Sequence, residues 1–184
     1  MWTPCTARWG TGSRRAAPGS ADYDGRVIEV VRGRCVAASP ERVWQVVSRA
    51  SSTAAWLADC DRVDVTSGAG CGERRTQHGR WDGHVSEVDQ EVVEFRRPTV
   101  IAWRHVAERL DGRPAPRFAL RTEFRVELAA TADGGTVVRL RLLQVPASEL
   151  RGLLLRVFGR RRAASAMDAS LDRLVDLLGR PEPR

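Results

Sequence analysis

Residues 27–59 of this 184-residue chain read VIEVVRGRCVAASPERVWQVVSRASSTAAWLAD, and this stretch decides the fold. Its first part, 27–37, is rich in valine and isoleucine and predicts a β-strand. Ser39 then suits the N-cap of a helix, Pro40 its first position and Glu41 the positive end of its dipole. A second short helix completes the stretch, so we expect the domain to open with one strand and two small helices.

A series of further strands follows without an intervening helix. Turn signals separate the apolar segments, as at Asp82-Gly83, Asp111-Gly112 and Asp133-Gly134-Gly135. Because these connections are short, we expect neighbouring strands to pair as an antiparallel meander. The predicted strands cover 62–66, 73–78, 84–95, 100–109, 118–130 and 136–145.

The last predicted hairpin alternates regularly enough to predict its register. Apolar and charged residues alternate on both strands, so a slip of one residue would place charges on the apolar face. A three-residue loop over 133–135 keeps the faces matched and sets Glu127 opposite Arg141 and Val126 opposite Leu142. Such exposed charge pairs are worth roughly a few tenths of a kcal/mol, so they select a register rather than supply stability.

One long amphipathic helix is expected to close the domain. Apolar residues recur at three- to four-residue spacing over 148–178, with Ser148 as the N-cap and Gly179 as the stop signal. About 30 residues at 1.5 Å each give a length of roughly 45 Å, enough to cross a whole sheet. Gly159 and the run Arg160–Arg162 interrupt the apolar stripe, so we expect a bend at this point.

The charge balance is basic, yet it does not predict a nucleic-acid partner. The net charge is +7, and all 30 basic residues are arginine, with no lysine and no asparagine. This bias is typical of a GC-rich genome, and the 23 acidic residues are interleaved with the arginines as on solvated faces. The sequence shows neither an RNA-binding aromatic motif nor a glycine-rich phosphate loop. We therefore expect no nucleic acid among the partners.

Residues 1–24 are expected to form a disordered tail before a single domain over 25–180. They are rich in small and polar residues and lack the apolar core of a signal peptide. No stretch approaches the roughly 20 apolar residues of a membrane span, which favours a cytoplasmic protein without an integral membrane segment. The four cysteines lack zinc-binding spacing, so we expect neither a metal nor another cofactor.

The order of these segments resembles the START-like superfamily, also called SRPBCC, which has the birch-pollen-allergen-like helix-grip fold. Within it, the chain is most similar to the bacterial polyketide cyclase/dehydrase-type branch. The resemblance covers about 27–178. It is carried by Ala38–Trp44, Trp56-Leu57, Gly72–Arg74, Val92–Phe95 with Pro98, Ile101–Arg104, Asp133–Thr136 and Leu171–Leu174.

The resemblance implies an α+β helix-grip architecture. A curved seven-stranded antiparallel sheet would wrap around the long C-terminal helix, with two short helices between the first two strands and an apolar cavity between sheet and helix. The superfamily includes lipid and hormone carriers, aromatic-ring cyclases and proteins of unknown role. Its catalytic residues differ from branch to branch, so the resemblance assigns none of them to this sequence.

Aromatic and aliphatic side chains on the strands and the final helix are candidates for the cavity wall. Trp103 shares a strand face with Ile101 and His105, and Trp81 lies in a turn near the expected mouth. Aromatic walls suit flat apolar ligands because they offer contact area and stacking geometry. The predicted wall consists of Trp81, Trp103, Phe118, Leu120, Phe124, Leu142, Leu154 and Phe158.

His105 and Thr122 are the candidate catalytic residues. A general acid–base role requires a histidine within hydrogen-bond reach of a substrate proton, and His105 lies across from the strand that carries Thr122. Thr122 is the polar residue on the apolar face of its strand, where it is suited to bind a ligand carbonyl. His78 and His84 lie on the two preceding strands, but neither spacing nor a carboxylate cluster predicts a metal site from the three histidines.

Three functions remain open from the sequence. The first is binding of a hydrophobic or aromatic small molecule in an apolar cavity. The second is a polyketide cyclase/dehydrase-like enzyme, an aromatase/cyclase, that orients a poly-β-ketone while His105 or Thr122 assists enolisation or loss of water. The third is a partner-binding or membrane-proximal module that uses the final helix, because Arg160–Arg162 lie beside Phe158. The sequence identifies neither the ligand nor the oligomeric state.

Overall fold

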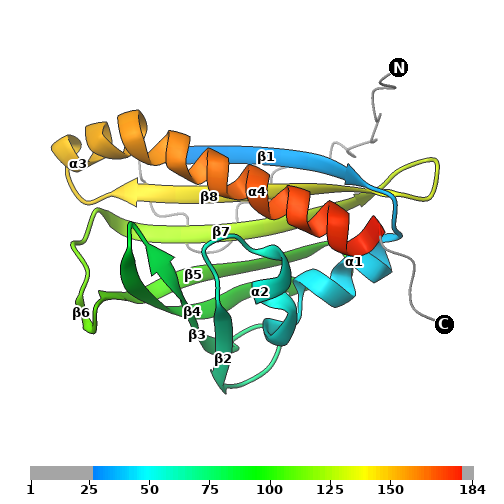
Figure 1. Cartoon of the computed structure of the whole chain (residues 1–184), viewed down its shortest axis with the longest axis horizontal. Helices are drawn as coiled ribbons and strands as arrows, with labels where there is room; N and C mark the ends of the chain where they lie inside the picture. The colour runs from blue at the N-terminus through cyan, green and yellow to red at the C-terminus, as the bar shows by residue number, and fades with distance from the viewer. Residues whose placement is uncertain (1–26, 180–184) are drawn as a thin grey trace.

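A curved antiparallel sheet wraps around a long C-terminal helix in the computed structural model, which describes residues 27–179 (Figure 1). The predicted tail over 1–24 lies outside the described residues. The strand order is β1-β8-β7-β5-β4-β3-β2, and the short β6 pairs with β5. The strands are β1 (Ile28–Val36), β2 (Arg62–Ser67), β3 (Arg74–Trp81), β4 (His84–Arg96), β5 (Val100–Leu110), β6 (Arg113–Pro114), β7 (Ala119–Ala130) and β8 (Thr136–Pro146).

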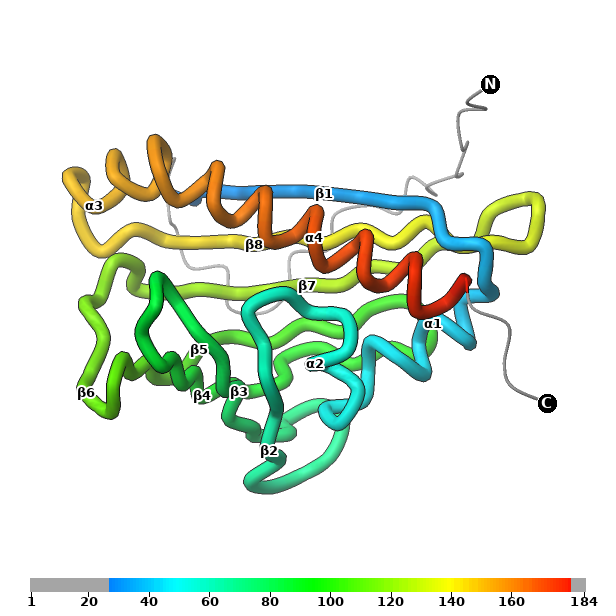
Figure 2. Tube along the Cα trace, in the orientation of Figure 1, coloured from blue at the N-terminus to red at the C-terminus, as the bar shows by residue number. Residues whose placement is uncertain are grey.

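The helical segment after β1 joins the two edges of the sheet. Helix α1 (Pro40–Val47), the 3₁₀ turn η1 (Ala50–Ser52) and helix α2 (Thr53–Trp56) carry the chain from the β1 edge to the β2 edge (Figure 2). Ser39 caps α1 as predicted, since its hydroxyl oxygen accepts a hydrogen bond from the Arg42 amide at 3.4 Å. The later strands then form a meander, and β8 returns to pair with β1.

The C-terminal helix changes its winding where the bend was predicted. Helix α3 (Glu149–Leu154) leads into a π-helical turn, η2 (Leu155–Gly159), and helix α4 (Arg160–Gly179) completes it. The hydroxyl of Ser148 accepts a hydrogen bond from the Arg151 amide at 3.3 Å and so begins α3. A π turn is a local widening of the helix, and here it lies where Gly159 and the arginines after it interrupt the apolar stripe. Within residues 27–179, no helix combines the length and the hydropathy that a membrane crossing requires.

Alternation along the strands gives the sheet one apolar face and one charged face, because residues two apart point the same way. The C-terminal helix covers the apolar, concave face, and Figure 1 shows it running across the sheet toward α1. This arrangement confirms the predicted helix-grip fold, with the two-residue β6 as an additional strand. The largest fully buried side chains include Trp56, Ile101, Trp103, Leu140, Leu171 and Leu174.

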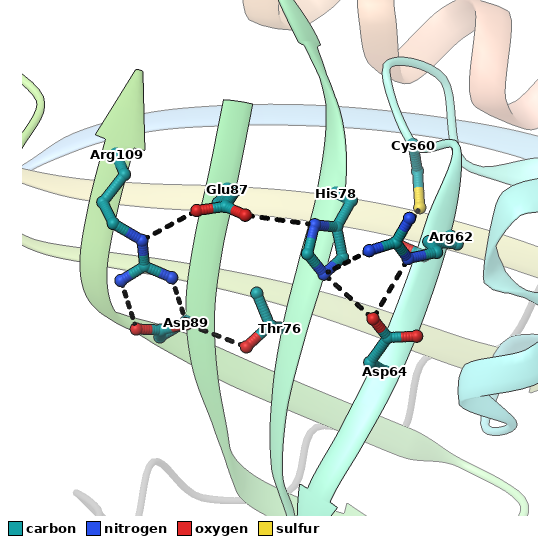
Figure 3. A network of polar contacts seen from close by, with 8 residues as sticks. All are labelled: Cys60, Arg62, Asp64, Thr76, His78, Glu87, Asp89 and Arg109. Carbon is teal, nitrogen blue, oxygen red and sulfur yellow. Dashed lines mark hydrogen bonds and ion pairs between the residues drawn. The ribbon is translucent and has the colours of Figure 1, made fainter. Parts of the chain in front are cut away.

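The opposite face carries a network of ion pairs across four strands (Figure 3). Two nitrogens of the Arg109 guanidinium donate to the two carboxylate oxygens of Asp89 at 2.7 and 2.9 Å, and its Nε donates to Glu87 at 2.9 Å. His78 lies next in line, 3.5 Å from Glu87 and 3.0 Å from Asp64 on the edge strand β2. The network links β2 to β5 on the face opposite the C-terminal helix.

The predicted register of the last hairpin is wrong by two residues. Glu127 pairs with Arg139 and Val126 with Leu140, because β7 and β8 meet at Ala130 and Thr136. The loop therefore spans five residues, and it is closed by the Thr131 amide, which donates to the Gly135 carbonyl at 2.9 Å. A shift of two keeps the apolar faces matched. Arg141 still reaches Glu127 at 3.2 Å, so the expected charge contact exists diagonally.

Gly79 of β3 lets the turn after α2 lie directly against the sheet. A Cβ atom at this position would lie 2.0 Å from the carbonyl oxygen of Asp59 and 2.9 Å from its carbonyl carbon. Asp59 itself has a φ of 59°, in the left-handed region that non-glycine residues rarely adopt. The absence of a side chain at position 79 therefore decides where the backbone of Asp59 lies.

We predict that Gly79→Ala destabilises the fold by at least about 3 kcal/mol, because backbone atoms rather than a flexible side chain would have to move. Urea unfolding followed by circular dichroism measures the loss. Gly33→Ala on β1 is the matched control, since its Cβ would lie 3.3 Å from a single carbonyl oxygen, and it should cost under about 1 kcal/mol. Equal stability of the two variants would contradict the close approach at Gly79.

The Asp89–Arg109 pair predicts a stability difference that depends on pH. Hydrogen bonds from Arg109 hold the pKa of Asp89 below its usual value. A carboxylate whose pKa is lower in the folded state stabilises the fold above its unfolded pKa of about 3.9. That contribution disappears as the pH falls through the lower, folded-state pKa.

We therefore expect Asp89→Asn to lose about 1 kcal/mol of unfolding free energy at pH 7, a modest value because the pair is partly exposed. The loss should shrink toward zero in acid, below the folded-state pKa. Denaturant titrations at neutral and acidic pH test whether the stability loss becomes smaller in acid. Asp176→Asn, which alters an exposed carboxylate on α4, serves as control and should change stability by under about 0.5 kcal/mol. A loss that grows in acid would refute the assignment.

Candidate functional site

A cavity of about 580 Å³ lies between the concave face of the sheet and the first half of the C-terminal helix. Its walls come from β5, β7 and β8, from the segment between β6 and β7, and from η2 and the start of α4. These elements meet at the end of the molecule that carries α3 and β6, opposite α1 (Figure 1). The site therefore draws on segments that are far apart in the sequence.

The hollow exists because the helix changes composition along its length. Gly159, Ala163 and Ala166 face the cavity, and their small side chains leave the space above the sheet open. One turn later the helix turns large residues toward the sheet: Met167, Leu171, Leu174 and Leu178 are all buried. The same helix thus fills one half of the concave face and leaves the other half empty.

A β-bulge in β5 places two titratable side chains together on the cavity wall. Ala107 pairs with Asp89 but His105 pairs with Gln90, so Val106 is an extra residue in the strand. In a regular strand, His105 and Glu108 would point to opposite faces; the extra residue turns both toward the cavity. Nδ1 of His105 lies 2.6 Å from Oε1 of Glu108, and both residues line the cavity.

The contact between His105 and Glu108 determines which ring nitrogen is available for chemistry. The hydrogen bond from His105 lowers the pKa of Glu108 below its usual value, so Glu108 is a carboxylate at neutral pH. A carboxylate only accepts hydrogen bonds, and therefore Nδ1 of His105 must carry the proton that it donates. When the ring carries only this proton, Nε2 can accept another, as a general base oriented by an acidic partner does.

Two uncharged polar residues also lie on the wall. Thr122 of β7 pairs with Gln144 of β8, so both lie on the concave face, and both line the cavity. Thr122 is 8% exposed, which places its hydroxyl group in a largely enclosed position. A hydroxyl and an amide at this position can donate hydrogen bonds to a ligand oxygen.

The mouth of the cavity is crossed by a contact between the helix and the β3–β4 turn. The guanidinium carbon of Arg162 lies 4.9 Å from the centre of the Trp81 ring, and its Nη1 lies 3.3 Å from Oδ1 of Asp82. Arg162 and Trp81 both line the cavity. A cation over an aromatic face is attracted to it, so Arg162 and Trp81 stay together at the opening and narrow it.

Six of the ten predicted site residues line the cavity. The structure brings together both candidate catalytic residues, His105 and Thr122, and four of the predicted wall residues, which are Trp81, Phe118, Leu120 and Leu142. Their roles in binding or catalysis stay predictions.

The other four predicted wall residues lie elsewhere. Trp103 is buried in the core, with its ring centre 5.0 Å from that of Phe124 and the guanidinium carbon of Arg75 4.4 Å from it. Phe124 packs against the same core. Leu154 and Phe158 point outward and are 41% and 69% exposed, because the side of the helix that faces the cavity carries Leu155 and Gly159 instead.

Sequence reasoning missed several residues of the site. Glu108 was hidden by the bulge at Val106, which strand alternation does not reveal. Arg162 and Asp59 reach the cavity through tertiary contacts. Gln144 could have been predicted from the sequence, because it follows Leu140 and Leu142 on the same strand face and is polar.

The other two histidines lie away from the cavity wall. His78 belongs to the network on the opposite face, and Nδ1 of His84 contacts Asp111 at 2.7 Å, between two turns. Among residues 27–179, no group of three histidine, cysteine, aspartate or glutamate side chains is placed to hold a metal ion.

Comparison with solved structures identifies the same fold in proteins of very different sequence. A major latex-like protein from Panax ginseng superposes with a TM-score of 0.66 at 10% identity, over 84% of this chain and 99% of its own. A protein from Thermus thermophilus gives 0.65 at 18% identity, over 82% and 97%. A START superfamily protein from Mycobacterium smegmatis gives 0.62 at 13% identity, over 84% and 98%.

The family itself is shown by sequence. Among curated proteins, no sequence matches this chain significantly. The family model described as "Polyketide cyclase / dehydrase and lipid transport" matches residues 27–179, which is the whole of the described domain. The chain therefore belongs to the polyketide cyclase/dehydrase and lipid transport family, within the START-like SRPBCC superfamily.

Proposed function

We propose that this protein binds a hydrophobic or aromatic small molecule with at least one oxygen substituent in the cavity. The observation that carries the proposal is the composition of the wall. Phe118, Leu120 and Leu142 supply apolar surface, whereas His105 and Thr122 supply hydrogen-bonding groups in the same cavity. A hollow of this size that combines apolar surface with convergent polar groups has the form of a small-molecule site.

Burial of apolar surface supplies enough free energy for useful affinity. A ligand that buries on the order of 400 Å² of apolar area gains about 10 kcal/mol, at roughly 25 cal/mol per Å². If association costs about 4 kcal/mol, the lower end of its range, about 6 kcal/mol remains, which corresponds to a Kd of tens of micromolar. Hydrogen bonds to Thr122 or His105 would then add affinity and select the orientation of the ligand.

Filling the cavity should abolish binding without unfolding the protein. Ala166 lines the cavity, so Ala166→Phe is expected to weaken binding of the neutral fluorescent probe N-phenyl-1-naphthylamine by about tenfold or more, through loss of buried contact area. Ala169→Phe on the exposed side of α4 is the matched control and should bind the probe like the wild type. Fluorescence titration measures both. Unchanged affinity of Ala166→Phe would contradict the cavity as the binding site.

A second candidate, an enzyme of the cyclase/dehydrase type, is favoured by the His105–Glu108 contact. A β-ketoester or β-ketothioester has an acidic proton between its two carbonyl groups. Nε2 of His105 would accept this proton, the electron pair of the C–H bond would move onto the adjacent carbonyl oxygen, and Thr122 or Gln144 would donate a hydrogen bond to the resulting enolate. Positioning of a general base contributes about 10² to 10⁴ in rate.

Deuterium exchange tests this candidate directly. If the protein is such an enzyme, it should accelerate exchange at the α-carbon of the N-acetylcysteamine thioester of acetoacetate in D₂O, followed by NMR. His105→Gln should then lower the catalysed rate by about a hundredfold while affinity for the fluorescent probe stays within about twofold. His84→Gln, which alters a histidine outside the cavity, is the control. Absence of acceleration by the wild type would exclude this chemistry and leave the binding proposal intact.

A further inference from the structure

Helix α3 and turn η2 present large apolar side chains to solvent. Leu150, Leu153, Leu154, Val157 and Phe158 are between 41% and 70% exposed. Their spacing of three and four residues places them on one side of the helix. We call these five residues the outer apolar face.

The opposite side of the same helix already lies against the domain, through two glycines and Leu155. Gly152 is buried against β8, where a Cβ atom would lie 3.2 Å from Cγ of Pro146. Leu155 and Gly159 continue this inner side along the cavity. Five of the six large apolar residues in 149–159 therefore point away from the sheet, the reverse of the usual amphipathic arrangement. Contiguous exposed apolar surface of this kind marks an interaction site.

Four exposed arginines flank the outer apolar face in the sequence: Arg151, Arg156, Arg160 and Arg161. Arg151 donates from Nη1 to the Arg117 carbonyl. Arg160 and Arg161 lie near Glu29 and Asp168, and Glu149 is the one acidic residue between 149 and 162. Arginine can lay its aliphatic stem along apolar surface while its guanidinium stays in a polar layer. A helix with a wide apolar face and flanking arginines has the pattern of an interfacial helix on an anionic membrane.

We propose that α3 and η2 dock on the surface of an anionic lipid bilayer. The five apolar side chains enter the boundary between headgroups and acyl chains, and the arginines bind lipid phosphates. A second copy of the chain fits this surface poorly, because a twofold dimer would bring the same four arginines face to face. Charge complementarity therefore favours the bilayer.

Docking in this way would place the cavity beside the membrane. Leu155 and Gly159 line the cavity from the inner side of η2. Val157 and Phe158 lie on the outer side of the same turn and are exposed. The distance between the two sides is the thickness of one helix. The proposal does not depend on which small molecule the cavity holds.

Co-sedimentation of the full chain with vesicles tests the proposal. The wild type should bind vesicles made of equal parts phosphatidylglycerol and phosphatidylcholine, and bind pure phosphatidylcholine vesicles more weakly. The double variant Leu153→Glu/Phe158→Glu should lose about tenfold or more of this affinity. Arg156→Gln/Arg160→Gln should lose roughly tenfold and flatten the dependence on salt, since each arginine near an anionic surface contributes to binding. Val65→Glu, at a 49% exposed valine on the edge strand β2, should bind like the wild type.

Three results would overturn the proposal. The first is failure of the wild type to bind anionic vesicles at low salt. The second is full binding by Leu153→Glu/Phe158→Glu with an unchanged thermal melt. The third is a wild-type dimer in size-exclusion chromatography that this variant dissociates, which would assign the outer apolar face to a second copy. Probe binding to the cavity is measured without vesicles, so a failure here is distinguishable from a failure of the proposed function.

Discussion

The structure depends on one constraint: the C-terminal helix, joined at one end by α1 and α2, has to cover the concave face of a curved sheet. Apolar sheet surface is stable only when something packs against it. Along most of α4 the helix fills this face with large side chains: Met167, Leu171, Leu174 and Leu178 are buried in the same core cluster as residues of the sheet, α1 and α2. Closer to α3 the side chains are too small to fill the space, because Gly159, Ala163 and Ala166 face the sheet across the cavity. Core and cavity are thus two outcomes of one packing problem.

The opposite, charged face of the sheet is held together by ion pairs rather than by apolar packing. On this face, opposite the C-terminal helix, cross-strand ion pairs run from Asp64 to Arg109 (Figure 3). A cation is also buried on the concave side, where Arg75 donates from Nε to Gln90 at 3.0 Å and lies over Trp103. Desolvation lowers the pKa of Arg75, yet its partners satisfy it within the core. Polar contacts on both faces hold β3, β4 and β5 in register beside the cavity.

The sequence predicted what local physics determines and missed what tertiary packing determines. Ser39 and Ser148 cap helices as expected, because a capping hydroxyl acts within one turn. The hairpin register was wrong because a five-residue loop, closed by the hydrogen bond from the Thr131 amide to the Gly135 carbonyl, replaces the expected three-residue loop. Glu108 was missed because a bulge belongs to a pair of strands rather than to one.

The helix itself produced the misassignment at the cavity wall. Leu154 and Phe158 belong to an apolar stripe, and such a stripe normally faces the core. The rule failed because glycine and alanine occupy the inner side at this end of the helix. The apolar stripe faces solvent at the end of the helix that lines the cavity. Sequences often break such packing rules at functional sites.

The division of the helix into a filled half and a hollow half has a consequence for evolution. Substitutions at Ala163, Ala166 or Leu142 reshape a space that is already open, whereas substitutions at Leu171 or Leu174 disturb close packing. The shape of the cavity can therefore change at one end of the domain while close packing at the other end keeps the fold. Proteins of 10% to 18% identity share this fold over most of both chains.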